Sequence, residues 1–162
     1  MIWIIRLFLF LYALLYIALG GWAIIEPGRM ELFGENFPSF MQYIGLSVTS
    51  PIGYSEIAGI YGGINIMLGL IALIGVFVNR FAKWACSLLI FLCGSIFLGR
   101  YVFSILHESI PGNSNIFFLN NDPNWYAIFE FASFFIFLIF LIFLNLQTKK
   151  DTKHKEAIDT NQ

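Results

Sequence analysis

The sequence predicts an all-α integral membrane protein, a bundle of four membrane-spanning helices with both termini in the cytoplasm. Apolar residues make up 59% of the 162 residues and charged residues only 12%, and the mean hydropathy is +0.78. A soluble domain is roughly a quarter charged. Four apolar runs are long enough for a helix that needs about 20 residues to cross the hydrocarbon core. Because the runs are continuous and do not alternate in polarity, they favour helices over a β-barrel.

The four predicted helices occupy most of the chain and leave no room for a second folded domain. They cover Ile2–Ile25, Ile57–Val78, Phe81–Leu106 and Trp125–Leu146. Residues 1–146 are therefore predicted to form one transmembrane domain. The tail, residues 147–162, has almost no apolar content and mixes Lys with Asp and Glu, so we expect it to be disordered and polar.

The distribution of basic residues predicts the orientation. Most of them fall at the amino terminus, between the second and third helices, and in the tail: Arg6, Arg80, Lys83, Lys149, Lys150, Lys153 and Lys155. The two connections on the other side carry only Arg29. Because loops rich in Lys and Arg stay in the cytoplasm, we expect a multi-pass protein of the cell (inner) membrane with a cytoplasmic tail.

Both outer connections are predicted to cover the outer end of the bundle. The first, residues 26–55, contains the apolar stretch Phe37–Leu46, which is suited to the membrane interface. The second, residues 107–124, is rich in Pro, Gly, Asn and Ser but carries the apolar insert Ile116–Leu119.

Three charged residues lie within the apolar segments or at their mouths: Glu56, Arg100 and Glu130. An unpaired charge in hydrocarbon costs at least about 2.5 kcal/mol, so such residues usually face the protein interior and pair. At a rise of about 1.5 Å per residue, Arg100 lies about 9 Å and Glu130 about 8 Å from the outer ends of their helices, with Glu56 at the outer mouth of its own. We therefore expect the Arg100 guanidinium to contact at least one carboxylate.

Together with nearby polar and aromatic side chains, these charged residues form a candidate ligand-binding site. Its predicted members are Glu56, Tyr61, Arg100, Ser104, Tyr126 and Glu130. All are placed in the outer half of the membrane, so they predict a polar pocket that opens outward. One guanidinium beside two carboxylates also predicts that one of the acids is neutral.

The second helix carries a pattern of small residues. Gly59 and Gly63 form a GxxxG pair on the stripe that begins at Glu56, and such pairs let another helix approach closely. We expect substitution at Gly63 to overpack this contact, whereas Gly75 near the inner end is expected to tolerate Ala.

The sequence predicts neither a metal nor a cofactor. His107 and His154 fall on opposite sides of the membrane, and no pair has the spacing of a zinc site. Cys86 and Cys93 are too far apart on one helix to form a disulfide. No nucleotide-binding or hydrolase motif and no nucleic-acid surface are present.

Short motifs resemble a known family. Glu56-Ile-Ala-Gly-Ile-Tyr-Gly-Gly63, Gly99-Arg100, Pro111-Gly112 and Glu130 are similar to those of a bacterial four-helix membrane family, domain of unknown function 4345, whose architecture is DoxX-like. The likeness covers about residues 8–146. The chain departs from it at Ala58, where relatives often carry a basic residue, and this departure favours a protonated Glu. The resemblance implies a fold and no activity.

Three functions are consistent with these features. The first is binding of a small amphiphile, a lipid head group or a quinone, against Arg100. The second is an intramembrane enzyme in which a buried Glu is the acid or base. The third is a structural accessory subunit of a membrane complex. The lipid bilayer is the expected partner, and the sequence leaves open a second copy or another membrane protein.

Overall fold

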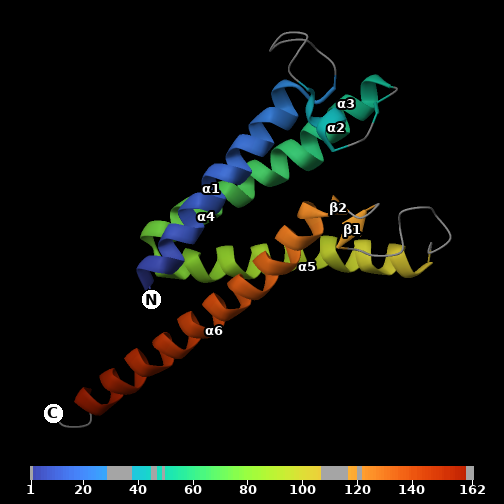
Figure 1. Cartoon of the computed structure of the whole chain (residues 1–162). Coiled ribbons are helices and arrows are strands. Elements are labelled where there is room, and N and C mark those ends of the chain that lie inside the picture. The colour runs from blue at the N-terminus through green and yellow to red at the C-terminus, as the bar shows by residue number, and fades with distance from the viewer. Residues whose placement is uncertain are drawn as a thin grey trace. The chain divides into compact units, whose positions relative to one another are not determined.

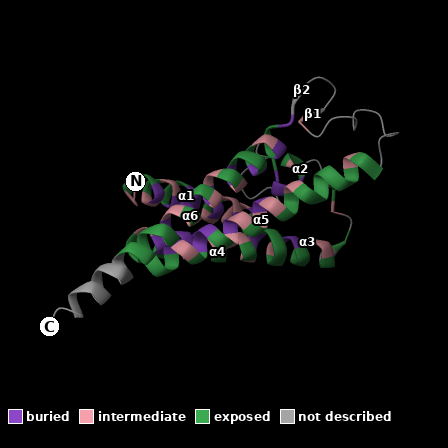
Figure 2. Cartoon of the chain, turned by 90° about the horizontal axis from the view of Figure 1, so that it is seen from below, coloured by how far each residue is buried: buried purple, intermediate pink, exposed green. Residues whose placement is uncertain are grey.

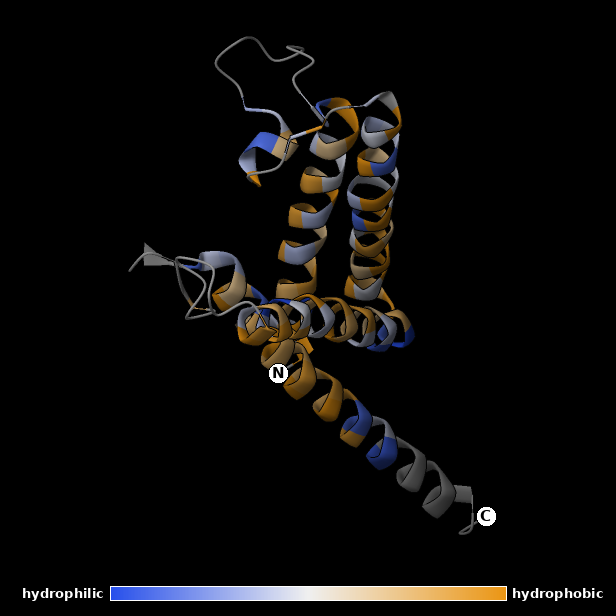
Figure 3. Cartoon of the chain, turned by 90° about the vertical axis from the view of Figure 1, so that its right-hand side faces the viewer, coloured by the Kyte–Doolittle hydropathy of each residue, from blue (hydrophilic) through white to orange (hydrophobic). Residues whose placement is uncertain are grey.

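The computed structural model describes residues 2–28, 38–44, 47–48, 50–106, 117–119 and 122–159, and for residues 51, 118–119, 122–123 and 151–159 only the backbone. These parts are almost entirely helical (Figure 1). Four stretches are long and apolar enough to cross a membrane: Ile2–Ile25, Ile52–Phe77, Asn79–Leu106 and Trp125–Lys150. Figure 3 shows hydrophobic residues along all four. The predicted helical class and the four helices long and apolar enough to cross a membrane are thereby confirmed, and they are consistent with an integral membrane protein.

The chain divides into two compact units, residues 1–85 and 86–162. The first is a helical hairpin. Helix α1 (Ile2–Ile25) packs along a second helical run made of α3 (Pro51–Ile57), the π-helical segment η1 (Ala58–Gly63) and α4 (Ile64–Phe77). The buried residues of α1 are three or four apart, so they form one stripe: Ile5, Leu9, Tyr12, Ala13, Tyr16, Gly20 and Ala23 (Figure 2).

Glycines bring the two helices of this hairpin into backbone contact. A Cβ atom at Gly20 would lie 2.7 Å from the Gly62 carbonyl oxygen and 2.9 Å from the Ile66 nitrogen. One at Gly69 would lie 3.0 Å from the Ala13 carbonyl oxygen. Without side chains at these positions the helices approach closely, as small residues permit in membranes.

Within the first unit, Gly59 and Gly63 do not make the close helix contact predicted for them. A Cβ at Gly59 would meet no described atom within 4 Å, and one at Gly63 would meet only the Ala58 oxygen, at 4.0 Å. Gly62 makes the contact instead. The predicted stripe through Gly59 and Gly63 is that of an α-helix, in which residues four apart lie on one face. The i→i+5 bonds of η1 widen the helical turn, so these two residues no longer align. The space around Gly75 is also smaller than predicted, because a Cβ added there would lie 3.0 Å from the Ala82 Cα.

The second helical run begins earlier than the sequence predicts. Ser50 is the N-cap of α3, and its Oγ accepts a 3.2 Å hydrogen bond from the Gly53 nitrogen. Pro51 occupies the first turn, where its missing N–H has no partner to lose. Glu56 therefore lies inside the helix and not at its mouth.

The described part of the connection between α1 and α3 packs over the end of α1. The short helix α2 (Phe40–Tyr43) begins at a capping box formed by Ser39 and Gln42. Its Phe40 nitrogen donates to the Glu26 carbonyl oxygen at 2.9 Å. Phe40 and Met41 are buried in a cluster with Ala23 and Ile57.

The second unit holds most of α5 (Asn79–Leu106) together with α6 (Trp125–Asp159). Their contacts run in opposite order along the two helices. The rings of Phe97 and Phe131 are 5.1 Å apart, and a Cβ at Gly94 would lie 2.9 Å from Phe134. Because lower numbers on α5 meet higher numbers on α6, the helices are antiparallel.

Helix α6 extends beyond the predicted span. The sequence predicts disorder from Gln147, whereas the backbone of α6 is helical through Asp159. Gln, Lys, Glu and Ala in this segment are good helix formers. Continuing an existing helix also avoids the cost of nucleation. Residues 107–116 of the second outer connection, including His107, lie outside the described residues.

Adjacent glycines of α1 provide a matched test of the hairpin. Gly20→Ala should destabilise the protein by about 1–3 kcal/mol, since the new Cβ meets backbone atoms that cannot turn aside. Gly21→Ala should be neutral or stabilise by up to about 1 kcal/mol, because Gly21 faces no described atom within 4 Å and Ala is the better helix former. Thermal unfolding in detergent compares the two variants. Equal melting temperatures would contradict this packing.

Candidate functional site

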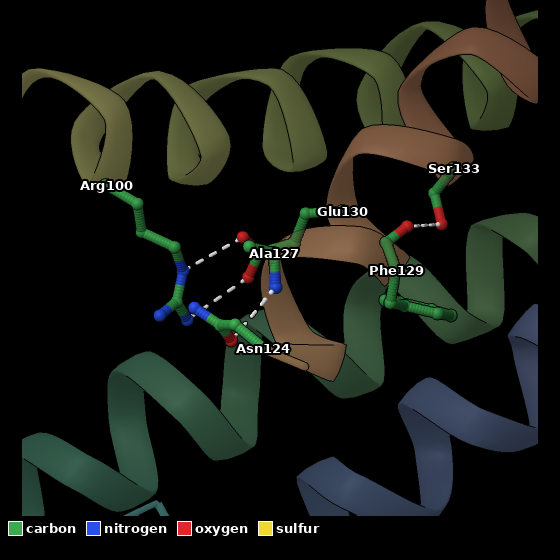
Figure 4. Close-up of polar contacts among 6 residues, drawn as sticks. All are labelled: Arg100, Asn124, Ala127, Phe129, Glu130 and Ser133. Atoms are coloured by element: carbon green, nitrogen blue, oxygen red, sulfur yellow. Dashed lines mark hydrogen bonds and ion pairs between the residues drawn. The ribbon is translucent and has the colours of Figure 1, made fainter. Parts of the chain in front are cut away.

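A two-point ion pair joins α5 to α6. The Arg100 Nε donates to Glu130 Oε2 at 2.9 Å, and the Arg100 Nη2 donates to Glu130 Oε1 at 3.3 Å (Figure 4). Parallel N–H bonds to both carboxylate oxygens fix the orientation of both groups and are stronger than neutral hydrogen bonds. The predicted contact between Arg100 and at least one acid is confirmed.

The two partners differ in exposure. The Glu130 side chain is 11% exposed, whereas the Arg100 side chain is 41% exposed. The Arg100 guanidinium carbon also lies 6.0 Å from the centre of the Tyr126 ring, within reach of a cation–π interaction. The carboxylate is therefore enclosed, while the Arg100 side chain remains partly accessible.

The start of α6 places Glu130. Asn124 is the residue before the helix, and its Oδ1 accepts a 3.3 Å hydrogen bond from the Ala127 nitrogen (Figure 4). The Asn124 nitrogen donates to the Phe117 carbonyl oxygen at 2.7 Å. Strands β1 (Phe118–Leu119) and β2 (Asp122–Pro123) pair antiparallel beside this bond, with Leu119 opposite Asp122. The connection thus anchors the first turn, from which Glu130 follows about one and a half turns later.

Aromatic rings cover the helix contact next to the ion pair. The Phe117 ring lies 5.9 Å from Phe97 and 5.6 Å from Phe131, centre to centre. Phe131 in turn packs edge-on against Phe135 at 4.8 Å. Such arrangements place ring edges against ring faces and are stabilising beyond their burial. They give the pair an apolar neighbourhood.

Two serines near the pair bond their own helices. The Ser104 Oγ donates to the Tyr101 carbonyl oxygen at 2.8 Å, and the Ser133 Oγ donates to the Phe129 carbonyl oxygen at 2.6 Å (Figure 4). Hydroxyls in membrane helices commonly satisfy themselves in this way. The Ser104 hydroxyl hydrogen is therefore used within α5, and a role for Ser104 in the site remains a prediction.

Two of the predicted site residues belong to the other unit. Tyr61 lies in η1, and its ring packs 5.6 Å from Phe40 of the α2 cap. Glu56 is exposed on α3. Of the six predicted residues, the structure brings together Arg100, Tyr126 and Glu130. That Glu56 and Tyr61 join them remains a prediction.

Three residues that the structure brings to attention were not among the predicted site residues. Asn124 directly precedes an apolar run, which is the usual signature of an N-cap, so its role was readable. Phe117 lies in the apolar insert of the second connection, but the sequence could not predict its partners, because they come from segments distant in sequence. Glu26, 2% exposed at the end of α1, is a buried acid that the sequence places simply after an apolar helix.

The described residues contain no group of three or more His, Cys, Asp or Glu side chains that could hold a metal ion. Cys86 and Cys93 are both buried thiols. The chain matches no protein-family model, no curated protein and no solved structure.

Charge exchange tests the ion pair. Removing one partner, as in Glu130→Gln, leaves the other charge without its counterion and should destabilise the protein by about 1–3 kcal/mol, less than a fully buried pair because Arg100 is partly exposed. The doubly exchanged variant Arg100→Glu with Glu130→Arg should recover part of this loss. Unfolding of single and double variants in detergent measures the coupling. Additive losses would show that the two side chains do not interact.

Proposed function

We propose that this chain is an inner-membrane protein that binds a small amphiphile through Arg100 of α5. The amphiphile is of the lipid head group or quinone type, with oxygen acceptors at its polar end. This proposal rests on the N–H donors of the Arg100 guanidinium that Glu130 does not use. A guanidinium has five N–H donors. Two are bonded to Glu130, and the other three, which bond no residue in the described part of the chain, can serve a ligand.

The surroundings of Arg100 support this type of ligand. Glu130 already balances the guanidinium charge, so a ligand gains most from accepting hydrogen bonds and need not carry a full negative charge. Phe97, Phe117 and Phe131 supply apolar surface close by. An amphiphile offers both features, because its acceptor atoms adjoin a hydrocarbon part.

A structural role is the second candidate, favoured by the two-point geometry itself. Arg100 and Glu130 come from different helices and fix their register. An intramembrane enzyme is less well supported, since Glu130 is engaged through both oxygens and a general acid or base must reach a substrate. Glu56, exposed on α3, is the other acid that this alternative would use.

We further propose that both termini are cytoplasmic and that the chain belongs with the DoxX-like family of unknown function that its motifs resemble. Seven basic residues on the proposed inner side, against Arg29 on the outer side, support the orientation. The motifs around Glu56, Arg100 and Glu130 support the family assignment.

Reporter fusions test the orientation. A reporter fused after Lys150 should report the cytoplasm, and one inserted near Asn113 should report the opposite side. Positive charge retained in the cytoplasm is the physical cause. A carboxyl-terminal reporter exposed on the outer side would rule out the proposed topology.

Ligand retention tests the binding function. Wild-type protein purified in mild detergent or native nanodiscs should carry an enriched amphiphile detectable by mass spectrometry of extracted lipids. Arg100→Gln should lose at least about 90% of it, since a charge-assisted hydrogen bond contributes about 1.5–3 kcal/mol and about 1.4 kcal/mol is tenfold in affinity.

The control is Lys149→Gln, which removes one positive charge from α6 far along the helix from Glu130. It should retain the amphiphile as the wild type does. Equal retention in Arg100→Gln, together with a lowered melting temperature, would reject binding and favour the structural role. A retained amphiphile that the protein alters, with the alteration lost in Glu130→Gln, would favour the enzyme.

A further inference from the structure

Exposed aromatic side chains mark the end of the second unit at which Arg100 lies. Trp125, the first residue of α6, is 70% exposed, and Tyr126 beside it is 45% exposed. Tyr101, near the carboxyl end of α5, is 48% exposed. Trp and Tyr side chains of membrane proteins prefer the interface between hydrocarbon and water. These residues therefore place the carboxyl end of α5 and the start of α6 at that interface.

The ion pair lies deeper than this interface. Glu130 follows Trp125 by five residues, and Arg100 precedes Leu106 by six. At a rise of about 1.5 Å per residue, these positions are about 8 and 9 Å along their helices from the interface. The head-group layer on one side of the hydrocarbon core is only about 5–8 Å thick. The pair is therefore at a level below lipid phosphates, where hydrocarbon begins.

The charge balance of the pair disfavours an anionic ligand at this depth. Arg100 and Glu130 carry one positive and one negative charge in direct contact. A phosphate bound to Arg100 would add a third charge, leave the site with a net negative charge and lie close to the Glu130 carboxylate. Charges removed from water are costly unless each is compensated. A neutral carbonyl oxygen that accepts a hydrogen bond avoids this cost.

The free donors of Arg100 suit such an oxygen. Glu130 occupies the edge formed by Nε and one hydrogen of Nη2. The remaining N–H groups belong to Nη1 and Nη2, and they bond no described residue. Figure 4 shows this end of the guanidinium directed away from Glu130. One carbonyl oxygen has two lone pairs, so it can accept from both nitrogens at once.

The surface of α5 next to Arg100 offers a place for a hydrocarbon chain. Ile96 precedes Arg100 by four residues, so it lies on the same face of α5, one turn nearer the centre of the membrane. Its side chain is 39% exposed. At the neighbouring Gly99 an added Cβ would meet no described atom within 4 Å. A chain that runs from Arg100 toward the membrane centre therefore contacts Ile96.

We infer that the ligand of Arg100 is a neutral amphiphile whose acceptor atoms are carbonyl oxygens and whose hydrocarbon chain lies along Ile96. A phospholipid bound through its phosphate does not fit this depth and charge balance. The inference rests on the proposed binding function and selects the class of ligand for it. The carbonyl belongs either to a quinone ring or to a glyceride ester, and the experiment separates these two sources.

Three probes with one decyl or decanoyl chain each test the class of ligand: decyl-benzoquinone, monodecanoylglycerol and decyl phosphate. Each is titrated into the full-length protein in detergent, and bound probe is measured by native mass spectrometry. At least one neutral probe should bind the wild type about tenfold more tightly than decyl phosphate, because only the phosphate adds a charge. The tighter of the two neutral probes identifies a ring or an ester carbonyl, and either result supports the inference.

Glu130→Gln tests the electrostatic reason for this selectivity. Gln keeps the size of the side chain and an oxygen acceptor but leaves the Arg100 charge unbalanced. The ratio of neutral-probe affinity to decyl phosphate affinity should therefore shift at least about tenfold toward decyl phosphate. A purely structural role of Glu130 would change the melting temperature and leave this ratio as it is. An unchanged ratio would overturn the inference.

Ile96→Ala tests the path of the chain while the ion pair stays intact. It should weaken the neutral probe at least about fourfold, which corresponds to losing contact with one methylene group. Leu98→Ala is the matched control, because Leu98 is also exposed but lies about half a turn away on the other side of α5. Equal affinities in the two variants would contradict the proposed path.

Arg100→Gln separates failure of this inference from failure of the proposed function. It should weaken the neutral probe at least about tenfold. If decyl phosphate instead binds the wild type as tightly as both neutral probes, and Arg100→Gln abolishes that binding, the ligand class is wrong and the binding function stands. If Arg100→Gln binds every probe as the wild type does, the binding function fails and the inference fails with it.

Discussion

A charge inside hydrocarbon has no water to solvate it, and this constraint governs the second unit. Arg100 meets Glu130 through two N–H bonds, and once that pair is made the register of α5 against α6 is fixed. The antiparallel contacts at Phe97 with Phe131 and at Gly94 with Phe134 follow from the same register. An isolated Arg or Glu at this position would cost several times more than the net gain of an ordinary hydrogen bond.

The two units hold their helices together by different means. Lipid tails are as apolar as Leu, so the hydrophobic effect contributes little to helix association inside a membrane. The first unit depends on close backbone approach at Gly20, Gly62 and Gly69. The second depends on an ion pair and on aromatic rings packed edge to face. Both means need accurate complementarity, because packing and polar contacts weaken quickly with distance.

Two arginines, one in each unit, lie in opposite electrostatic settings. Arg100 is balanced by the carboxylate of Glu130. Arg6 is held by the neutral Asn79, and its helix contains no acid. The difference comes from the neighbour and not from the guanidinium.

The sequence by itself determined the helical class and the four spans, because length and hydropathy are local properties of each segment. It also indicated that Arg100 would pair, because an unpaired charge within an apolar helix is unfavourable. Only the tertiary structure decided that Gly62, and not Gly59 or Gly63, meets α1. That choice depends on the π-helical turns of η1, which no regular repeat encodes. Likewise, Phe117 joins Phe97 and Phe131 only because a connection folds back over two helices, and contacts between distant segments leave no periodic pattern in the chain.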